Sequence, residues 1–83
     1  MDEIVLEIIN RDFTENEREI AISEINSITL EHVTAQAEDN LNNTRLSILK
    51  LSKGDLDKLK KHVKSAKSDF RNLIYWATLE ENT

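Results

Sequence analysis

The chain contains no cysteine, no proline and a single glycine among its 83 residues. Without cysteine there is no disulfide framework, no thiolate nucleophile and no thiolate metal ligand. Few folds of short strands and tight turns can be built with so little glycine and proline. No run of residues approaches the roughly 18–20 apolar residues that a membrane-spanning helix needs. These absences favour one helical domain comprising residues 1–83, with no spanning segment.

The N-terminus does not resemble a secretion signal. Asp2 and Glu3 make it acidic rather than basic, and Glu7 interrupts the apolar run from Ile4 to Ile9. We therefore expect the protein to be cytoplasmic, and the absence of cysteine is compatible with that reducing compartment.

The last third of the chain carries the clearest helical pattern. Its apolar residues are spaced by alternating steps of three and four, at Leu56, Leu59, Val63, Ala66, Phe70, Leu73 and Ala77. This period predicts one helix of about six turns, capped by Asp55 and ending near Leu79. Gly54 fits the left-handed C-cap of a preceding helix. That helix is predicted to start from Ser27 or Thr29 and to end near Ser52, which makes a long antiparallel hairpin with a tight connection.

The N-terminal part predicts two shorter helices. Residues 2–11 favour a helix over the alternative of a strand, because no second strand is available for pairing. Phe13 is a predicted core residue, and the capping-box pattern Thr14–Glu17 predicts a helix from Glu15 to about Asn26. The expected fold is all-α: a small antiparallel bundle of three to four helices that ends in the long hairpin.

Charge is divided between the two halves of the chain. Residues 1–40 carry a net charge of −9 and residues 41–83 a net charge of +4. One interpretation is that acidic helices pack beside basic helices within the molecule. The other is a dipolar surface that steers a charged partner.

Three polar or aromatic clusters are candidate binding sites. The first is a polar seam beside the apolar stripe of the predicted middle helix, formed by Gln36, Asn40, Asn43 and Ser47. It is interpreted as a polar pocket or a hydrogen-bonded seam to a partner, or alternatively as a local kink or polar contacts at the edge of the hairpin.

The second cluster is a basic stripe at helical spacing, formed by Lys60, Lys64, Lys67 and Arg71. It is a candidate site for a polyanion such as nucleic acid. The acidic net charge of −5, the lack of interleaved aromatic residues and the poor match to a helix-turn-helix around Gly54 favour a solvated face or an acidic protein partner instead.

The third cluster is the aromatic end, with Tyr75 and Trp76 at the centre of a candidate partner surface and Lys67 and Arg71 at its rim. Tyrosine and tryptophan suit interface centres because they contribute large contact area. The alternative is that the N-terminal segment folds over this end and buries it.

No pattern indicates catalysis or a bound cofactor. His32 and His62 each lack a second ligand at helical metal-site spacing, and no serine sits in a glycine-flanked nucleophile elbow. There is no phosphate loop and no dinucleotide fingerprint. We expect a non-enzyme with no metal and no cofactor.

One segment resembles a known pattern. The run from Leu49 to Leu56, Leu-Lys-Leu-Ser-Lys-Gly-Asp-Leu, followed by Ala66 and then Asp69-Phe70-Arg71, resembles a pattern of small uncharacterised bacterial proteins without an assigned function. The resemblance covers about residues 44–77 and implies a small helical bacterial protein, with no activity, cofactor or ligand residue. Within this pattern, Asp69 is predicted to pair with Arg45 across the hairpin.

The function expected from these observations is a non-catalytic protein–protein interaction, as a regulator, an adaptor or a homo-oligomer. One alternative is a nucleic-acid-associated regulator that uses the basic stripe. Another is a neutralising partner, of the immunity or antitoxin kind, for a basic protein. No membrane association and no small-molecule ligand are expected.

Overall fold

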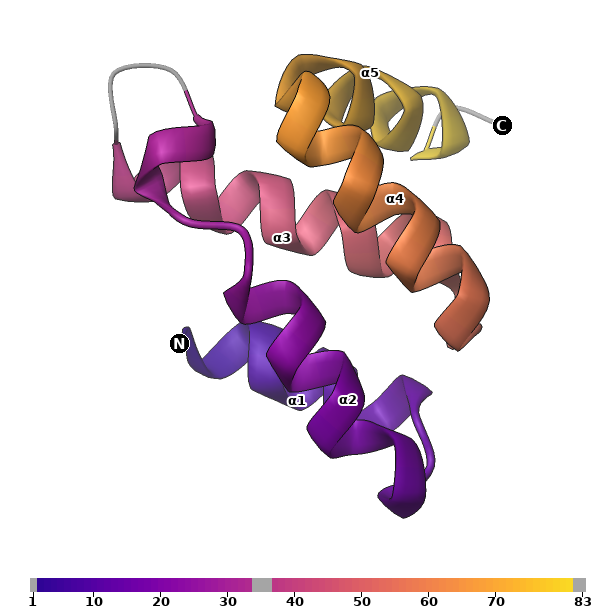
Figure 1. Ribbon diagram of the computed structural model, residues 1–83. Helices are drawn as coiled ribbons and strands as arrows, with labels where there is room; N and C mark the ends of the chain where they lie inside the picture. The colour runs from indigo at the N-terminus through magenta and orange to yellow at the C-terminus, as the bar shows by residue number, and fades with distance from the viewer. Residues whose placement is uncertain (1, 34–36, 82–83) are drawn as a thin grey trace.

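The structure is a computed structural model that describes residues 2–33 and 37–81 (Figure 1). Within these ranges the chain forms five α-helices and one 3₁₀ turn, and no strand. The elements are α1 (Glu3–Asp12), α2 (Glu15–Asn26), η1 (Leu30–His32), α3 (Glu38–Ser52), α4 (Leu56–Ser68) and α5 (Phe70–Glu81). The all-α bundle expected from the sequence is confirmed. None of the described helices is long and apolar enough to cross a bilayer.

Helix α3 is the centre of the molecule. It packs against α1, α4 and α5, whereas α2 packs mainly against α1 and α4 (Figure 1). The core consists mainly of aliphatic side chains from every helix, and its largest fully buried members include Ile9, Ile25, Ile28, Ile48, Leu49 and Leu59. Burial of these side chains supplies the main favourable contribution to folding.

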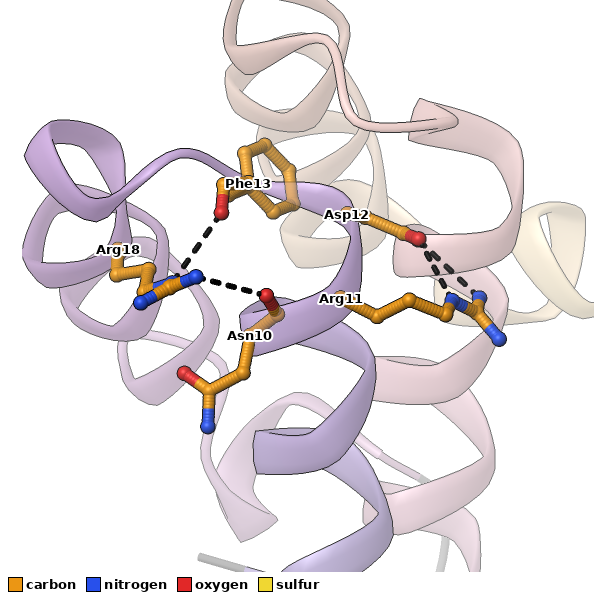
Figure 2. Close-up of polar contacts among 5 residues, drawn as sticks. All are labelled: Asn10, Arg11, Asp12, Phe13 and Arg18. Atoms are coloured by element: carbon orange, nitrogen blue, oxygen red, sulfur yellow. Dashed lines mark hydrogen bonds and ion pairs between the residues drawn. The ribbon is translucent and has the colours of Figure 1, made fainter.

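Helices α1 and α2 form an N-terminal hairpin. Hydrogen bonds from Arg18 join its two helices, and the expected Thr14–Glu17 capping box is not formed. The Thr14 hydroxyl donates to Glu17 Oε1 at 3.2 Å, and it does not accept the Glu17 amide as predicted. Arg18 Nε donates to the Phe13 carbonyl at 3.2 Å, and Arg18 Nη2 donates to the Asn10 carbonyl at 3.0 Å (Figure 2). These bonds satisfy carbonyls at the end of α1, which has no further helical turn to supply donors. Phe13 is buried, as predicted.

The predicted middle helix is shorter than expected. Instead of starting at Ser27 or Thr29, α3 begins at Glu38 and follows the 3₁₀ turn η1. The Thr29 amide donates to His32 Nδ1 at 3.0 Å, and the Thr29 and His32 side chains form a capping box around η1. These polar side chains satisfy the backbone locally, so the chain turns there instead of continuing as a helix. The segment Asn40–Thr44 lies inside α3 without a break.

The predicted final helix is also interrupted, and this prediction was wrong. Asp69 adopts an extended backbone (φ −157°, ψ 100°) and separates α4 from α5. Its Oδ1 atom accepts the Arg71 amide at 3.1 Å, so Asp69 satisfies a free donor at the start of α5. The residues Ala66 and Phe70 on either side of the break remain buried.

The connection between α3 and α4 requires the single glycine. Lys53 and Gly54 both have positive φ, of 50° and 78°, and Asp55 then caps α4 by accepting the Lys58 amide at 3.1 Å. A Cβ atom on Gly54 would lie 2.6 Å from the Asp12 carbonyl oxygen at the end of α1. Glycine is therefore needed here for its backbone conformation and for the close approach of α1.

Candidate functional site

The outer face of α5 exposes three large apolar side chains, which we call the aromatic face. These are Tyr75, Trp76 and Leu79, with exposed fractions of 62%, 42% and 46%. Successive residues of an α-helix are rotated by about 100°, so the three side chains cover a continuous sector of the helix surface. Tyr75, the most exposed of the three, points away from the core.

Trp76 also lines a crevice of about 350 Å³ between α5, α4 and the end of α3, which we call the Trp76 crevice. Its lining residues are Leu51, Lys53, Lys58, Lys61, His62, Trp76 and Glu80. Lys53 Nζ lies 3.2 Å from Glu80 Oε2, an exposed ion pair that joins the ends of α3 and α5. The crevice therefore combines an indole ring with three ammonium groups and one carboxylate.

This crevice exists because the chain doubles back at Asp69. In one continuous helix, Lys58 and Trp76 would be about 27 Å apart along the axis. In the structure both residues line the same crevice, because α5 returns along α4. Lys58 and Lys61 of α4 therefore line the crevice together with Trp76, a pairing that helical spacing in the sequence does not indicate. Asp69, a strong capping residue, was the available signal for the break.

The two cations predicted at the rim of the aromatic surface, Lys67 and Arg71, do not line the Trp76 crevice. Lys67 is exposed in the last turn of α4, and Arg71 is exposed in the first turn of α5. Arg71 shares a side of α5 with Tyr75, because the two are one turn apart.

The predicted basic stripe is divided by the same break. Lys60, Lys64 and Lys67 are exposed on α4, and Arg71 follows on α5. Arg71 Nε lies 3.2 Å from Asp69 Oδ1, and this hydrogen bond lowers the pKa of the Asp69 carboxyl. The predicted pair of Asp69 with Arg45 is therefore wrong, since Asp69 bonds its own neighbour instead.

Two residues of the predicted polar seam line a second cavity. Asn43 and Ser47 project from α3 into a groove of about 550 Å³ between α1 and α5, which we call the α1–α5 groove. Asn40 contributes its carbonyl, which accepts a 2.7 Å bond from the buried Thr44 hydroxyl. Gln36 lies outside the described residues.

The α1–α5 groove is mainly apolar and has no acidic lining residue. It is lined by Ile4, Ile8, Arg11, Asn43, Leu46, Ser47, Lys50, Ile74, Ala77 and Thr78. Helix α1 therefore faces the Ile74 side of α5 and leaves the aromatic face exposed. The N-terminal segment therefore does not bury the aromatic residues, as the alternative interpretation had it.

His62 is the titratable group of the Trp76 crevice with a resolved shift. Desolvation lowers its pKa, with smaller contributions from the positive charges of Lys61 and Lys58. Its Nδ1 atom is buried and makes no hydrogen bond to the described part of the chain. His32 is engaged with Thr29 in the η1 cap. The described residues contain no group of three or more metal-ligating side chains suited to a metal ion.

Comparison of the chain with protein-family models, with curated proteins and with solved structures returned no match.

Proposed function

We propose that the protein is a non-catalytic interaction module that binds an acidic segment of another protein over Trp76. The observation that carries this proposal is the half-exposed Trp76 indole beside Lys58 and Lys61 in one crevice. An apolar side chain of the partner would enter the crevice, and carboxylates beside it would face the lysines.

The chemistry of the crevice favours this partner. Tryptophan dominates many interfaces because a rigid ring buries a large area at low entropic cost. The three lysines outnumber the single carboxylate of Glu80, which is itself bonded to Lys53. Such a positive rim steers an acidic partner towards the indole and disfavours a basic one.

The experiment uses Trp76 as its own reporter, because it is the only tryptophan of the chain. Proteins retained by the wild-type chain are identified, and each purified candidate is titrated while Trp76 emission is followed. Burial of the indole should shift the emission to shorter wavelength. Trp76→Ala should weaken binding about 30-fold or more, as expected for a central aromatic residue. The double variant K58E/K61E should also weaken binding, more at low salt than at high salt.

A matched control is available on another helix. Ile20 of α2 is 43% exposed, similar to Trp76, and lies outside the crevice. Ile20→Ala should leave binding unchanged. If a retained partner binds the Trp76→Ala, Tyr75→Ala double variant as tightly as the wild type, the proposal is wrong.

Binding to nucleic acid is a separate outcome of the same series. Lys60 and Lys64 are exposed on α4 but do not line the Trp76 crevice. Salt-sensitive binding to duplex or single-stranded nucleic acid that is lost in K60E/K64E and retained in K58E/K61E would favour the basic stripe. Retention of a basic protein through the acidic N-terminal half would favour the neutralising role instead.

A further inference from the structure

The α1–α5 groove is a second surface, distinct from the aromatic face, and its two ends differ. The Lys53–Glu80 ion pair brings together the C-terminal ends of α3 and α5. The close approach of Gly54 to the Asp12 carbonyl brings the end of α3 to the end of α1. The three helices that line the groove therefore run in the same direction, with their C-terminal ends at one end of the groove.

The cationic residues of the groove lie towards that C-terminal end. Arg11 is in the last turn of α1, and Lys50 is in the last turn of α3. Figure 2 shows Arg11 extending towards α3 and bonded to Asp12, on the side of α1 opposite to Arg18. Ile4 lies one turn before Ile8 and marks the other end of the groove. The Ile4 side chain is 55% exposed, so the apolar wall of the groove is incompletely covered.

The charges and dipoles of the groove define the helix that fits it. A helix that enters antiparallel to α1, α3 and α5 puts its N-terminal turn beside Arg11 and Lys50. Acidic residues are favoured in a first helical turn and would face these cations. Apolar residues one turn apart would then follow along the groove and contact Ile8, Ile74 and Ile4.

Helix α1 of the chain itself has these properties. It begins with the exposed Glu3, and Ile4 and Ile8 follow one turn apart on the side that lines the groove. A second α1 laid antiparallel therefore brings its Glu3 to Arg11 and its Ile4 towards Ile8. Helix α1 supplies both the groove wall and the entering helix. With a two-fold axis between the copies, the α1 helix of each copy therefore occupies the groove of the other.

We propose that the α1–α5 groove binds a second copy of the chain, with the two α1 helices antiparallel about a two-fold axis. The groove spans only about two helical turns along α1. The area buried there should therefore be smaller than the about 800 Å² per partner of a standard interface. The dimer should therefore dissociate in the micromolar range, at about 1–100 μM, and depend on salt.

The first test is the mass of the full chain in solution, by light scattering and sedimentation from about 1 μM to 1 mM. The wild type should shift from monomer to dimer over this range, and added salt should favour the monomer. Ile4→Glu should abolish the dimer. Ile20→Glu, a similarly exposed position on α2 outside the groove, should not. A wild-type chain that stays monomeric throughout would overturn the proposal.

A charge swap tests the register of the two α1 helices. Glu3→Arg and Arg11→Glu should each raise the dissociation constant about tenfold, since each places like charges together. The double variant should return to within about threefold of the wild type, because the two charges again attract. Glu15→Arg is the matched control, because Glu15 occupies the same first-turn position of α2. A dimer that is unaffected by either single change would contradict this placement.

The position of the axis can be tested by a disulfide, because the native chain has no cysteine. Pairing Glu3 of one copy with Arg11 of the other places Glu7 of both copies near the axis. Glu7→Cys should therefore form a disulfide-linked dimer under mild oxidation, and Glu19→Cys on α2 should not. A dimer that links equally through both positions would refute the antiparallel arrangement. Trp76→Ala should leave all these results unchanged, so failure of this inference is distinguishable from failure of the proposed function.

Discussion

Arg45 Nη2 donates a 2.7 Å hydrogen bond to the main-chain carbonyl of Ile28, and this bond joins α3 to the segment that follows α2. The Arg45 side chain is only 9% exposed, and burial lowers its pKa. Ile28 is fully buried beside it. The buried guanidinium of Arg45 is thus hydrogen-bonded to a backbone carbonyl between α2 and α3.

Replacement of Arg45 should separate its packing from its hydrogen bond. Arg45→Ala removes both and should lower the free energy of unfolding by about 3 kcal/mol. Arg45→Met keeps most of the buried volume and should cost about 1 kcal/mol. Urea denaturation of both variants measures the difference, with the exposed Lys60→Ala as a control that changes little. Equal losses in the two variants would show that side-chain volume contributes little.

Opposite effects are expected at the two adjacent residues of positive φ. Gly54→Ala should destabilise the fold by about 2 kcal/mol or more, because its Cβ would overlap the Asp12 carbonyl oxygen. Lys53→Gly should stabilise it by roughly 0.5–1 kcal/mol, because glycine adopts a φ of 50° without the cost that lysine carries. Thermal unfolding followed by circular dichroism gives both signs in one experiment. Stabilisation by Gly54→Ala would show that α1 does not approach the turn this closely.

Asp69 should control the break between α4 and α5. Asp69→Ala removes the acceptor of the Arg71 amide and should lower the urea midpoint, whereas Asp69→Asn keeps an acceptor and should lower it less. With the cap removed, the emission of Trp76 should also change, because the break holds the indole beside α4. Unchanged stability and emission in Asp69→Ala would mean that packing alone maintains the break.

The titration of Asp69 provides a second measurement at the same residue. Hydrogen bonds from Arg71 hold the pKa of the Asp69 carboxyl below its ordinary value of 3.8. Its contribution to stability is therefore present above that pH and disappears as the pH falls through the lowered pKa. Arg71→Gln should return the pKa of Asp69 towards 3.8, as measured by carboxyl chemical shifts. A pKa that stays fully low in this variant would show that the backbone amide of residue 71, which the substitution keeps, causes the shift and that the guanidinium does not.

His62 should make the fold less stable in mild acid. Desolvation, Lys61 and Lys58 lower its pKa below 6.5, so the unfolded chain binds a proton more readily than the folded chain. This contribution is fully present above pH 6.5 and is lost as the pH falls through the lowered pKa. His62→Gln should remove that part of the pH dependence of stability. Lys58→Gln or Lys61→Gln should raise the pKa of His62, seen in its ring-proton shifts, and a lower pKa would contradict the assigned cause.

The helical class and several helix ends could be predicted, because they depend on local signals. Asp55 caps α4, as its position after a helical run indicates. The left-handed C-cap of α3 is Lys53 and not Gly54 as predicted, although Gly54 follows it with a positive φ. The break at Asp69 escaped prediction because Ala66 and Phe70 both remain buried on its two sides. An apolar period records which residues face the core, and it does not record the direction in which the helix axis continues.

In the candidate sites too, features set by local spacing could be predicted, and features set by the path of the chain could not. The exposure of Tyr75 could be predicted from helical phase alone, because neighbouring apolar positions define the core side. The pairing of Trp76 with Lys58 and Lys61 could not, because it depends on the reversal of direction at Asp69. The spacing of Thr29 and His32, three residues apart, was a readable signal for the turn before α3.

The contact between Gly54 and the Asp12 carbonyl has a kinetic consequence. The two residues are about forty positions apart in sequence, and closing a flexible loop of that length costs roughly 3 kcal/mol of chain entropy. Helices α3, α4 and α5 are sequence neighbours joined by short connections, so they can assemble before this loop closes. We therefore expect α1 to dock last during folding, and Gly54→Ala to accelerate unfolding while leaving the folding rate almost unchanged.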